Sequence, residues 1–209
     1  MHILLINPAH LSIGSRMPNE HLPPLGLLSI GGPLIDAGQT VRLLDADYHN
    51  YSVEKVAECV VADRPDVIML GHSGSTSAQP IINDITRLVK AALPHVTVII
   101  GGVFPTYHWA EILQTQPQID YIVCGEGEET VLKVVATLQA DAPVAHIRGI
   151  ALRIDGVPTQ TLAAANIKNL DDFRIGWEQS QASPTPACVH DPARFRSPFL
   201  RSICAAHAR

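Results

Sequence analysis

The sequence predicts an α/β fold built on a doubly wound sheet of five parallel strands, in the flavodoxin-like or Rossmann-like class. Short runs of aliphatic and β-branched residues alternate with longer segments of helical period, which is typical of parallel βαβ units. Of the 209 residues, 46% are hydrophobic and 17% are charged. Such a chain can bury the core that this sheet requires.

Five apolar runs predict the strands. Each run is short, rich in valine, isoleucine and leucine, and bounded by glycine, proline or polar residues. Continuous apolar runs of this kind are typical of parallel strands, which are buried on both faces. The strands are expected at residues 2–6, 40–47, 66–73, 96–102 and 119–125.

The segments between and after these runs have apolar residues at helical spacing. The first helix begins at two prolines and ends at Gly38, and Ser52 suits the N-cap of the second. Gly31 and Gly32 interrupt the first helix, and close packing on a ligand or on the sheet would explain them. The helices are expected at residues 23–38, 52–64, 78–94, 109–115 and 128–139.

The expected strand order is 2-1-3-4-5, with right-handed crossovers. In this order the loops after the first, third, fourth and fifth strands meet at one edge of the sheet, where a ligand should bind. Residues 146–162 predict a β-hairpin with Asp155 and Gly156 at its turn. The expected divisions are an α/β domain at 1–142, the hairpin and a connector at 143–179, and an irregular, poorly ordered tail at 180–209.

The charge and composition argue against several classes of protein. The net charge is −5, and lysine and arginine are scattered as far as residue 194, so nucleic acid is not an expected partner. No window approaches the roughly 18–20 apolar residues of a membrane span, and the first residues lack a leader pattern, so a cytoplasmic protein is expected. The four cysteines form no C-x-x-C pair, which disfavours a zinc ribbon or a redox dithiol.

Four loops at the expected binding edge are rich in small residues. They read NPAHLSIGSR (7–16), GHSGSTS (71–77), GGVFPT (101–106) and GEGEE (125–129). Glycine is common in any βα turn, but four such loops on one edge favour a large, flat ligand with many hydrogen bonds. P-loop and dinucleotide fingerprints are absent, which argues against an ordinary nucleotidase or dehydrogenase.

The last of these loops carries three glutamates at the start of a helix, where carboxylates complement the helix dipole. A catalytic carboxylate pair is the alternative interpretation. It is not favoured, since nothing else in the loops has the character of a nucleophile or a polarised base.

In order and spacing, five segments resemble one family. They are INP, PPLGLLSIGGPLIDAGQTVRLLDAD, GHSGST, IIGGVFPTYHWAEIL and DYIVCGEGEETVLKVV. Together they resemble the cobalamin-binding, Rossmann-like domain at the front of cobalamin-dependent radical-SAM enzymes, and the resemblance extends to about residue 178. Within that family, the connector NLDDFRIGWE is most similar to that of the anaerobic magnesium-protoporphyrin IX monomethyl ester cyclases, enzymes of tetrapyrrole biosynthesis.

The resemblance implies a base-off cobalamin whose corrin ring lies over the strand ends and whose nucleotide tail enters between sheet and helix. It places Asn7, Pro8 and His10 under the corrin and Gly125, Glu126 and Gly127 at the far wall. The residues that it places around the tail are Ser73, Gly74, Ser75, Thr76, Gly101, Gly102, Pro105 and Thr106.

One departure from the family concerns catalysis. Full-length relatives carry C-x-x-x-C-x-x-C, whose thiolates bind an iron–sulfur cluster. Cys188 and Cys204 cannot provide that spacing, so no iron–sulfur cluster is expected in this chain, and whether the chain is an enzyme by itself stays open. One hypothesis is a truncated or frame-shifted product; the other is a stand-alone cobalamin carrier that serves a radical-SAM enzyme in trans.

The other departure concerns the lower cobalt ligand. Other cobalamin domains use D-x-H-x-x-G, in which the acid orients the ligating histidine. Here the sequence reads P-x-H-x-x-x-G, and Pro8 offers no side-chain acceptor for the histidine. His10 is therefore a candidate cobalt ligand, but the favoured interpretation is that it is a solvated histidine in a loop. The alternative function is a flavodoxin-like protein that binds a flavin or a nucleotide, which would need a phosphate cradle after the first strand.

Overall fold

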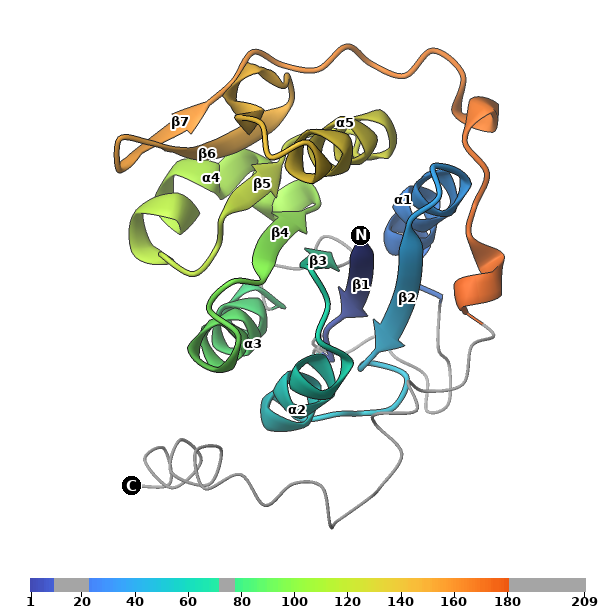
Figure 1. The fold of residues 1–209 in the computed structure, drawn as a ribbon, viewed down its shortest axis with the longest axis vertical. Helices are drawn as coiled ribbons and strands as arrows, with labels where there is room; N and C mark the ends of the chain where they lie inside the picture. Colours follow the sequence, from blue (N-terminus) through green and yellow to red (C-terminus); the bar gives the residue numbers. More distant parts are fainter. Residues whose placement is uncertain (10–22, 72–77, 181–209) are drawn as a thin grey trace.

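The computed structural model describes residues 1–9, 23–71 and 78–180 (Figure 1). These residues form a seven-stranded sheet in the order β2-β1-β3-β4-β5-β6-β7, covered by helices on both faces. The predicted order 2-1-3-4-5 of the parallel strands is confirmed. Those strands are β1 (His2–Asn7), β2 (Thr40–Asp45), β3 (Val67–Gly71), β4 (Thr97–Gly101) and β5 (Tyr121–Val123).

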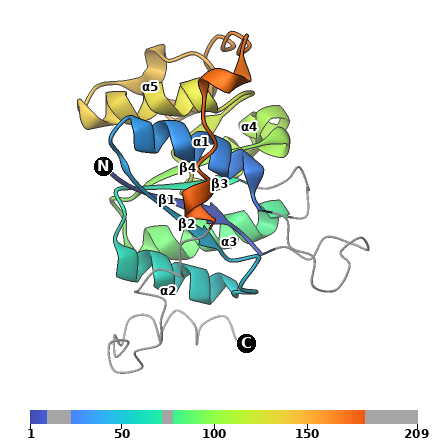
Figure 2. The ribbon, with the colours of Figure 1, turned by 90° about the vertical axis from the view of Figure 1, so that its right-hand side faces the viewer.

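The helices lie on both faces of the sheet, with α1 and α5 on one and α2 and α3 on the other (Figure 2). Their bounds are α1 (Leu25–Asp36), α2 (Val53–Asp63), α3 (Gln79–Ala92), α4 (Val103–Thr115) and α5 (Glu128–Gln139). Each face has its own core, because successive strand residues point to opposite sides. In β1, Ile3 and Leu5 pack in the core on the α1 side, whereas Leu4 and Ile6 pack in the core on the α2 side.

The predicted hairpin is confirmed and extends the sheet. Strands β6 (Ile150–Ile154) and β7 (Val157–Gln160) pair antiparallel, and β6 also pairs antiparallel with β5. Asp155 and Gly156 both have positive φ, 51° and 80°, as a two-residue type I′ turn requires. The hairpin therefore covers the edge of β5 that a five-stranded sheet would leave open.

Helix α4 begins at Val103, earlier than the predicted residue 109. Gly102, with φ 112°, turns the chain directly into the helix, and Pro105 lies in the first turn, where a missing N–H costs nothing. His108 has non-helical angles, φ −114° and ψ 18°, so the helix is kinked there. The predicted helix is the part that follows this kink.

A connector, residues 161–180, passes back over α1 (Figure 2). The Gly176 N–H donates to the Leu28 carbonyl at 2.9 Å, and a Cβ added at Gly32 would lie 2.1 Å from the Arg174 carbonyl oxygen. A Cβ at Gly31 would lie 3.1 Å from Leu5 on the sheet. The glycine pair thus serves two close contacts: Gly31 packs on the sheet, as expected, and Gly32 packs on the connector.

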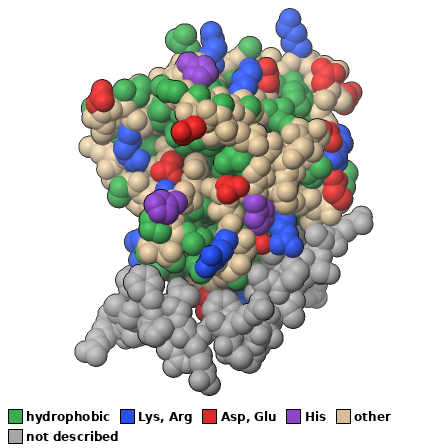
Figure 3. All heavy atoms as spheres, viewed as in Figure 1, with side chains coloured by type: hydrophobic (Ala, Val, Ile, Leu, Met, Phe, Trp, Pro, Cys, Tyr) green, Lys and Arg blue, Asp and Glu red, His purple; other side chains and the backbone are tan. Residues whose placement is uncertain are grey.

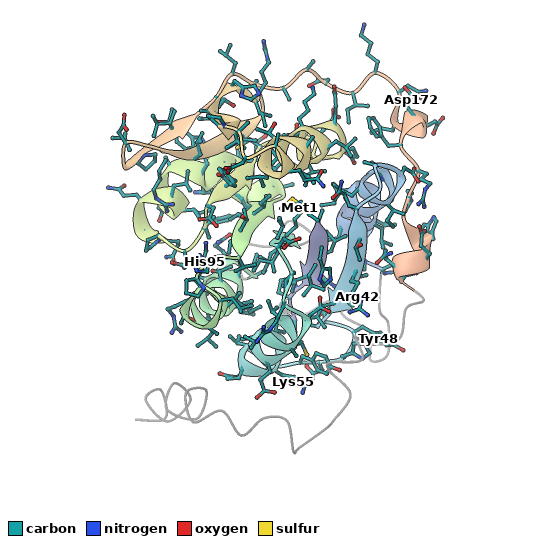
Figure 4. All side chains as sticks on the ribbon, viewed as in Figure 1. Met1, Arg42, Tyr48, Lys55, His95 and Asp172 are labelled. Carbon is teal, nitrogen blue, oxygen red and sulfur yellow. The ribbon has the colours of Figure 1, made fainter. Side chains whose placement is uncertain are left out.

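The connector is fixed at several further points. The Arg174 guanidinium lies 2.7 Å from the Asp36 carboxylate and 2.8 Å from that of Glu178. Short 3₁₀ turns occur in it at Leu170–Asp172 and Trp177–Gln179. Asp172 marks the first of them in Figure 4. The predicted tail falls, from residue 181 on, outside the described residues.

The opposite, amino edge of the sheet contains a buried ion pair. The Asp63 side chain is 2% exposed; one oxygen lies 2.6 Å from Arg42 and the other 3.0 Å from His2 Nε2. Arg42 extends from β2 towards α2 (Figure 4). On the face drawn in Figure 3, basic and acidic side chains of the described residues are interspersed. No helix within the described ranges is long and apolar enough to cross a membrane.

Candidate functional site

At the carboxyl edge of the sheet, two neighbouring strands end in glycine. Gly71 of β3 pairs with Gly101 of β4, and Gly101 pairs with Val123 of β5. A Cβ at Gly71 would lie 3.2 Å from Leu27, and one at Gly101 would lie 3.6 Å from the Val123 carbonyl oxygen. Gly71 was not among the predicted site residues, although a glycine at the end of two successive strands is a signal that the sequence contains.

One hydrogen-bonded chain ties together the loops after β4 and β5. The Gly125 N–H donates to the Thr106 hydroxyl oxygen at 3.1 Å, and that hydroxyl donates to the Gly102 carbonyl at 2.8 Å. All three residues belong to the predicted site. The structure therefore brings two of the four predicted loops into direct contact.

The loop after β5 combines an open position with a close approach. Gly125 is exposed, has φ 84°, and would carry a Cβ with no atom within 4 Å. A Cβ at Gly127 would lie 3.1 Å from Ile30 of α1. Gly125 leaves open backbone at the edge, and Gly127 lets this loop pack against α1.

Glu126 is occupied by a contact that sequence reasoning missed. Its carboxylate accepts a hydrogen bond from the Ile167 N–H of the connector at 2.5 Å. The neighbouring Glu129 forms an ion pair with Lys133 at 2.7 Å along α5. Both contacts are structural, and each satisfies a carboxylate next to the helix N-terminus.

Asn7 is buried, 7% exposed, at the end of β1. Its side-chain amide donates to Asp45 Oδ1 at 2.8 Å, and the same oxygen accepts from the Tyr48 N–H at 3.1 Å. Asn7 thus holds the ends of β1 and β2 together, and Pro8, also buried, follows it. Asp45 is a second residue that was missed, because this contact becomes visible only when the two strands are paired.

The other predicted residues divide into two groups. Pro105 is buried in the first turn of α4, next to the Gly102–Thr106–Gly125 chain. The remaining predicted residues, His10, Ser73, Gly74, Ser75 and Thr76, lie outside the described residues.

The described titratable groups near this edge do not form a metal site. Burial raises the pKa of the Cys124 thiol, although a hydrogen bond with Gln160 opposes the shift, so the thiol stays protonated at neutral pH. His108 stacks on Phe104 with ring centroids 4.2 Å apart. Within residues 1–9, 23–71 and 78–180, no three His, Cys, Asp or Glu residues are grouped so that they could hold a metal ion. What the described part of this edge offers a ligand is the open backbone at Gly125.

Comparison with known proteins yields relatives named as anaerobic magnesium-protoporphyrin IX monomethyl ester cyclases or as methyltransferases. The chain is 51% identical, over 178 residues, to an anaerobic magnesium-protoporphyrin IX monomethyl ester cyclase of Synechocystis, an alignment that covers 85% of this chain and 36% of the relative. It is 28% identical to the cyclase of Cereibacter sphaeroides, over 98% of this chain and 35% of the relative. The chain therefore spans about a third of the length of these relatives.

Solved structures share the fold. The radical S-adenosylmethionine methyltransferase TsrM of Kitasatospora setae has a TM-score of 0.66 at 17% identity, covering 78% of this chain and 30% of that protein. OxsB, solved with aqua-cobalamin and S-adenosylmethionine bound, has a TM-score of 0.66 at 18% identity, covering 78% of this chain and 22% of OxsB. The family model for the B12 binding domain matches residues 17–135, more than half of the chain. The chain belongs to the B12-binding domain family.

Proposed function

We propose that the chain binds cobalamin at the carboxyl edge of its sheet. The observation that carries the proposal is the side-chain-free backbone of Gly101, Gly102 and Gly125 at this edge. Thr106 holds the two loops that contain these glycines together. A large, flat ligand needs such an edge, because any side chain there would keep the ring away from the backbone. The family membership of residues 17–135 supports the same ligand.

The residues present fit this ligand by their chemistry. Gly125, at the far wall, has open space where a Cβ would stand, and Gly101 and Gly102 would border the nucleotide tail. Ser73, Gly74, Ser75 and Thr76 would hold the nucleotide tail together with Pro105 and Thr106. Glu126 and Gly127 would close the far wall, while Asn7 and Pro8 would lie under the ring.

Cobalamin supplies a cobalt centre that can carry a methyl group. His10 would not ligate the cobalt, because Pro8 stands where an orienting acid would be needed. The residues of this chain bind and position the cofactor, and Asn7 acts by fixing the ends of β1 and β2 through Asp45.

As a wider proposal, the chain is the cobalamin-binding part of a cytoplasmic radical-SAM system with a porphyrin substrate. Support comes from its 51% identity to the Synechocystis cyclase over 178 residues. The iron–sulfur cluster and S-adenosylmethionine would be bound by a radical-SAM domain outside these residues, in trans if the chain is a separate carrier. By itself the chain would hold no cluster, since its cysteines lack the C-x-x-x-C-x-x-C spacing.

Titration with hydroxocobalamin tests the function and its rival class together. Purified protein is mixed with hydroxocobalamin, FMN or ATP and desalted, and the retained ligand is measured from its absorption spectrum. The expected result is about one corrin retained per chain and neither FMN nor ATP. Retention of FMN without corrin would identify the chain as a flavodoxin-like, flavin-binding protein. Retention of none of the three ligands would refute cobalamin binding.

A further inference from the structure

Gln79 has a buried side-chain oxygen without a partner. It is the first residue of α3 and is 6% exposed. In the described part of the chain, three buried side-chain atoms lack a hydrogen bond, and two of them, His2 Nε2 and Asp63 Oδ2, lie 3.0 Å from each other. Gln79 Oε1 is therefore the one of the three that does not lie beside another of them.

The amide nitrogen of Gln79, unlike its oxygen, has a partner. Gln79 Nε2 donates to Asn83 Oδ1 at 2.8 Å, one turn further along α3. The oxygen is therefore the atom of this amide that is buried and unsatisfied.

The position of Gln79 directs this atom towards the proposed site. Helix α3 is the helix that follows β3, so it begins at the carboxyl edge of the sheet. Side chains in a helix lean towards its N-terminus, which for Gln79 is that edge. Because the amide nitrogen already donates to Asn83, the oxygen is the amide atom that remains for a ligand.

A buried, unsatisfied amide destabilises the free protein, since it has lost water without gaining a partner. Two of its neighbours along the helix, Ala78 and Ile82, are apolar and 0% exposed. An apolar side chain would suit the free protein better. A polar side chain at this position is useful if the bound ligand provides a hydrogen-bond donor for it.

We infer that the Gln79 side-chain amide hydrogen-bonds to bound cobalamin, with its oxygen accepting from an N–H or O–H group of the cofactor. This inference rests on the proposed function. Cobalamin has such donors in two places, the amide side chains around the corrin ring and the hydroxyl of the ribose in its nucleotide tail. Gln79 would then be satisfied only in the loaded protein.

The substitution Gln79→Met separates this role from a purely structural one, because the two effects have opposite signs. Without ligand, the melting temperature should rise by about 2–4 °C, since a buried unsatisfied group is removed and half-buried Asn83 can turn to water. The dissociation constant for hydroxocobalamin should increase about tenfold, the loss expected for one hydrogen bond to a buried partner. Both are measured on the purified full chain, by thermal unfolding and by visible-spectrum titration.

Gln118→Met is the matched control. Gln118 is half-buried, and its amide nitrogen already donates to Gln116 Oε1 at 2.7 Å and to the Asn83 carbonyl at 3.4 Å. The same replacement there should leave the dissociation constant unchanged and should give no gain in melting temperature. A gain in Gln118→Met equal to that in Gln79→Met would attribute the effect to methionine and overturn the inference.

Cobinamide, which lacks the nucleotide tail, locates the donor. If Gln79→Met weakens cobinamide binding as much as cobalamin binding, the donor is a corrin amide; if cobinamide is bound equally by both proteins, the donor is in the tail. Unchanged cobalamin affinity in Gln79→Met, or a lower melting temperature of this variant without ligand, would overturn the inference. The proposed function would still stand in that case, provided that the wild-type chain binds cobalamin. A wild-type chain that binds no corrin would instead refute the proposed function itself.

Discussion

Thr106 links the loops after β4 and β5, because its hydroxyl accepts a hydrogen bond from the Gly125 N–H and donates one to the Gly102 carbonyl. Thr106→Val keeps the shape and removes both hydrogen bonds, which leaves the Gly125 N–H to point at a methyl group. We expect a loss of about 1 kcal/mol in unfolding free energy and a several-fold weaker affinity for hydroxocobalamin. Denaturant unfolding and spectroscopic titration measure the two effects, and Thr106→Ser should restore both.

Thr115→Val is the control for this substitution. Thr115 lies on the same helix and donates to the carbonyl four residues before it, that of Glu111, at 2.9 Å, but it accepts no hydrogen bond from another loop backbone. Its replacement should leave the affinity for hydroxocobalamin unchanged. If Thr106→Val also left the affinity unchanged, the Gly102–Thr106–Gly125 chain would not belong to the binding site.

His10 is the residue at which the sequence departs most clearly from histidine-ligated cobalamin domains, because Pro8 replaces the acid. A histidine without an acceptor for its second ring nitrogen is a weaker and less well oriented ligand. We therefore expect the visible spectrum of the hydroxocobalamin complex to be the same in His10→Ala and wild type. A spectral shift on substitution would identify His10 as the lower ligand.

At the level of elements, local patterns predicted the sheet, its strand order and the hairpin turn. Parallel strands and a type I′ turn each depend on residues that are adjacent in the sequence. The early start of α4 was missed, since it depends on the positive φ of Gly102 and on the kink at His108. Contacts across the chain were missed for a different reason. The pairs Asn7–Asp45 and Glu126–Ile167 join segments whose proximity only the folded topology creates.

The connector and α1 make a contact that depends on the absence of one side chain. Gly32→Ala would place a Cβ 2.1 Å from the Arg174 carbonyl oxygen, so the connector would have to move. We expect a loss of about 1–3 kcal/mol in unfolding free energy, as for other overpacked contacts. Limited trypsin digestion should also cut faster at Lys168 and Arg174 than in wild type.

Gly26→Ala in the same helix is the comparison for this prediction. A Cβ at Gly26 would meet no atom within 4 Å, so the substitution adds helix propensity without a clash. It should raise stability by up to about 0.5–1 kcal/mol and leave the trypsin pattern unchanged. Equal trypsin patterns for Gly32→Ala and wild type would mean that the connector does not depend on this contact.

At the scale of the whole molecule, the fold separates two edges of different character. The amino edge carries an ion pair between Arg42 and the buried Asp63, whose second oxygen lies 3.0 Å from His2 Nε2. The carboxyl edge carries open glycine backbone and the unsatisfied Gln79 oxygen. This asymmetry is the reason for placing the ligand at the carboxyl edge, as open α/β sheets do in general.

Hydrogen–deuterium exchange with and without hydroxocobalamin tests this placement most directly, because it reports on every backbone amide of the unmodified chain. We predict slower exchange with ligand in peptides covering 101–106 and 125–127, and no change in peptides covering the amino edge at 63–67. Unchanged exchange at the carboxyl edge in a protein that retains the corrin, or protection confined to the amino edge, would contradict the account.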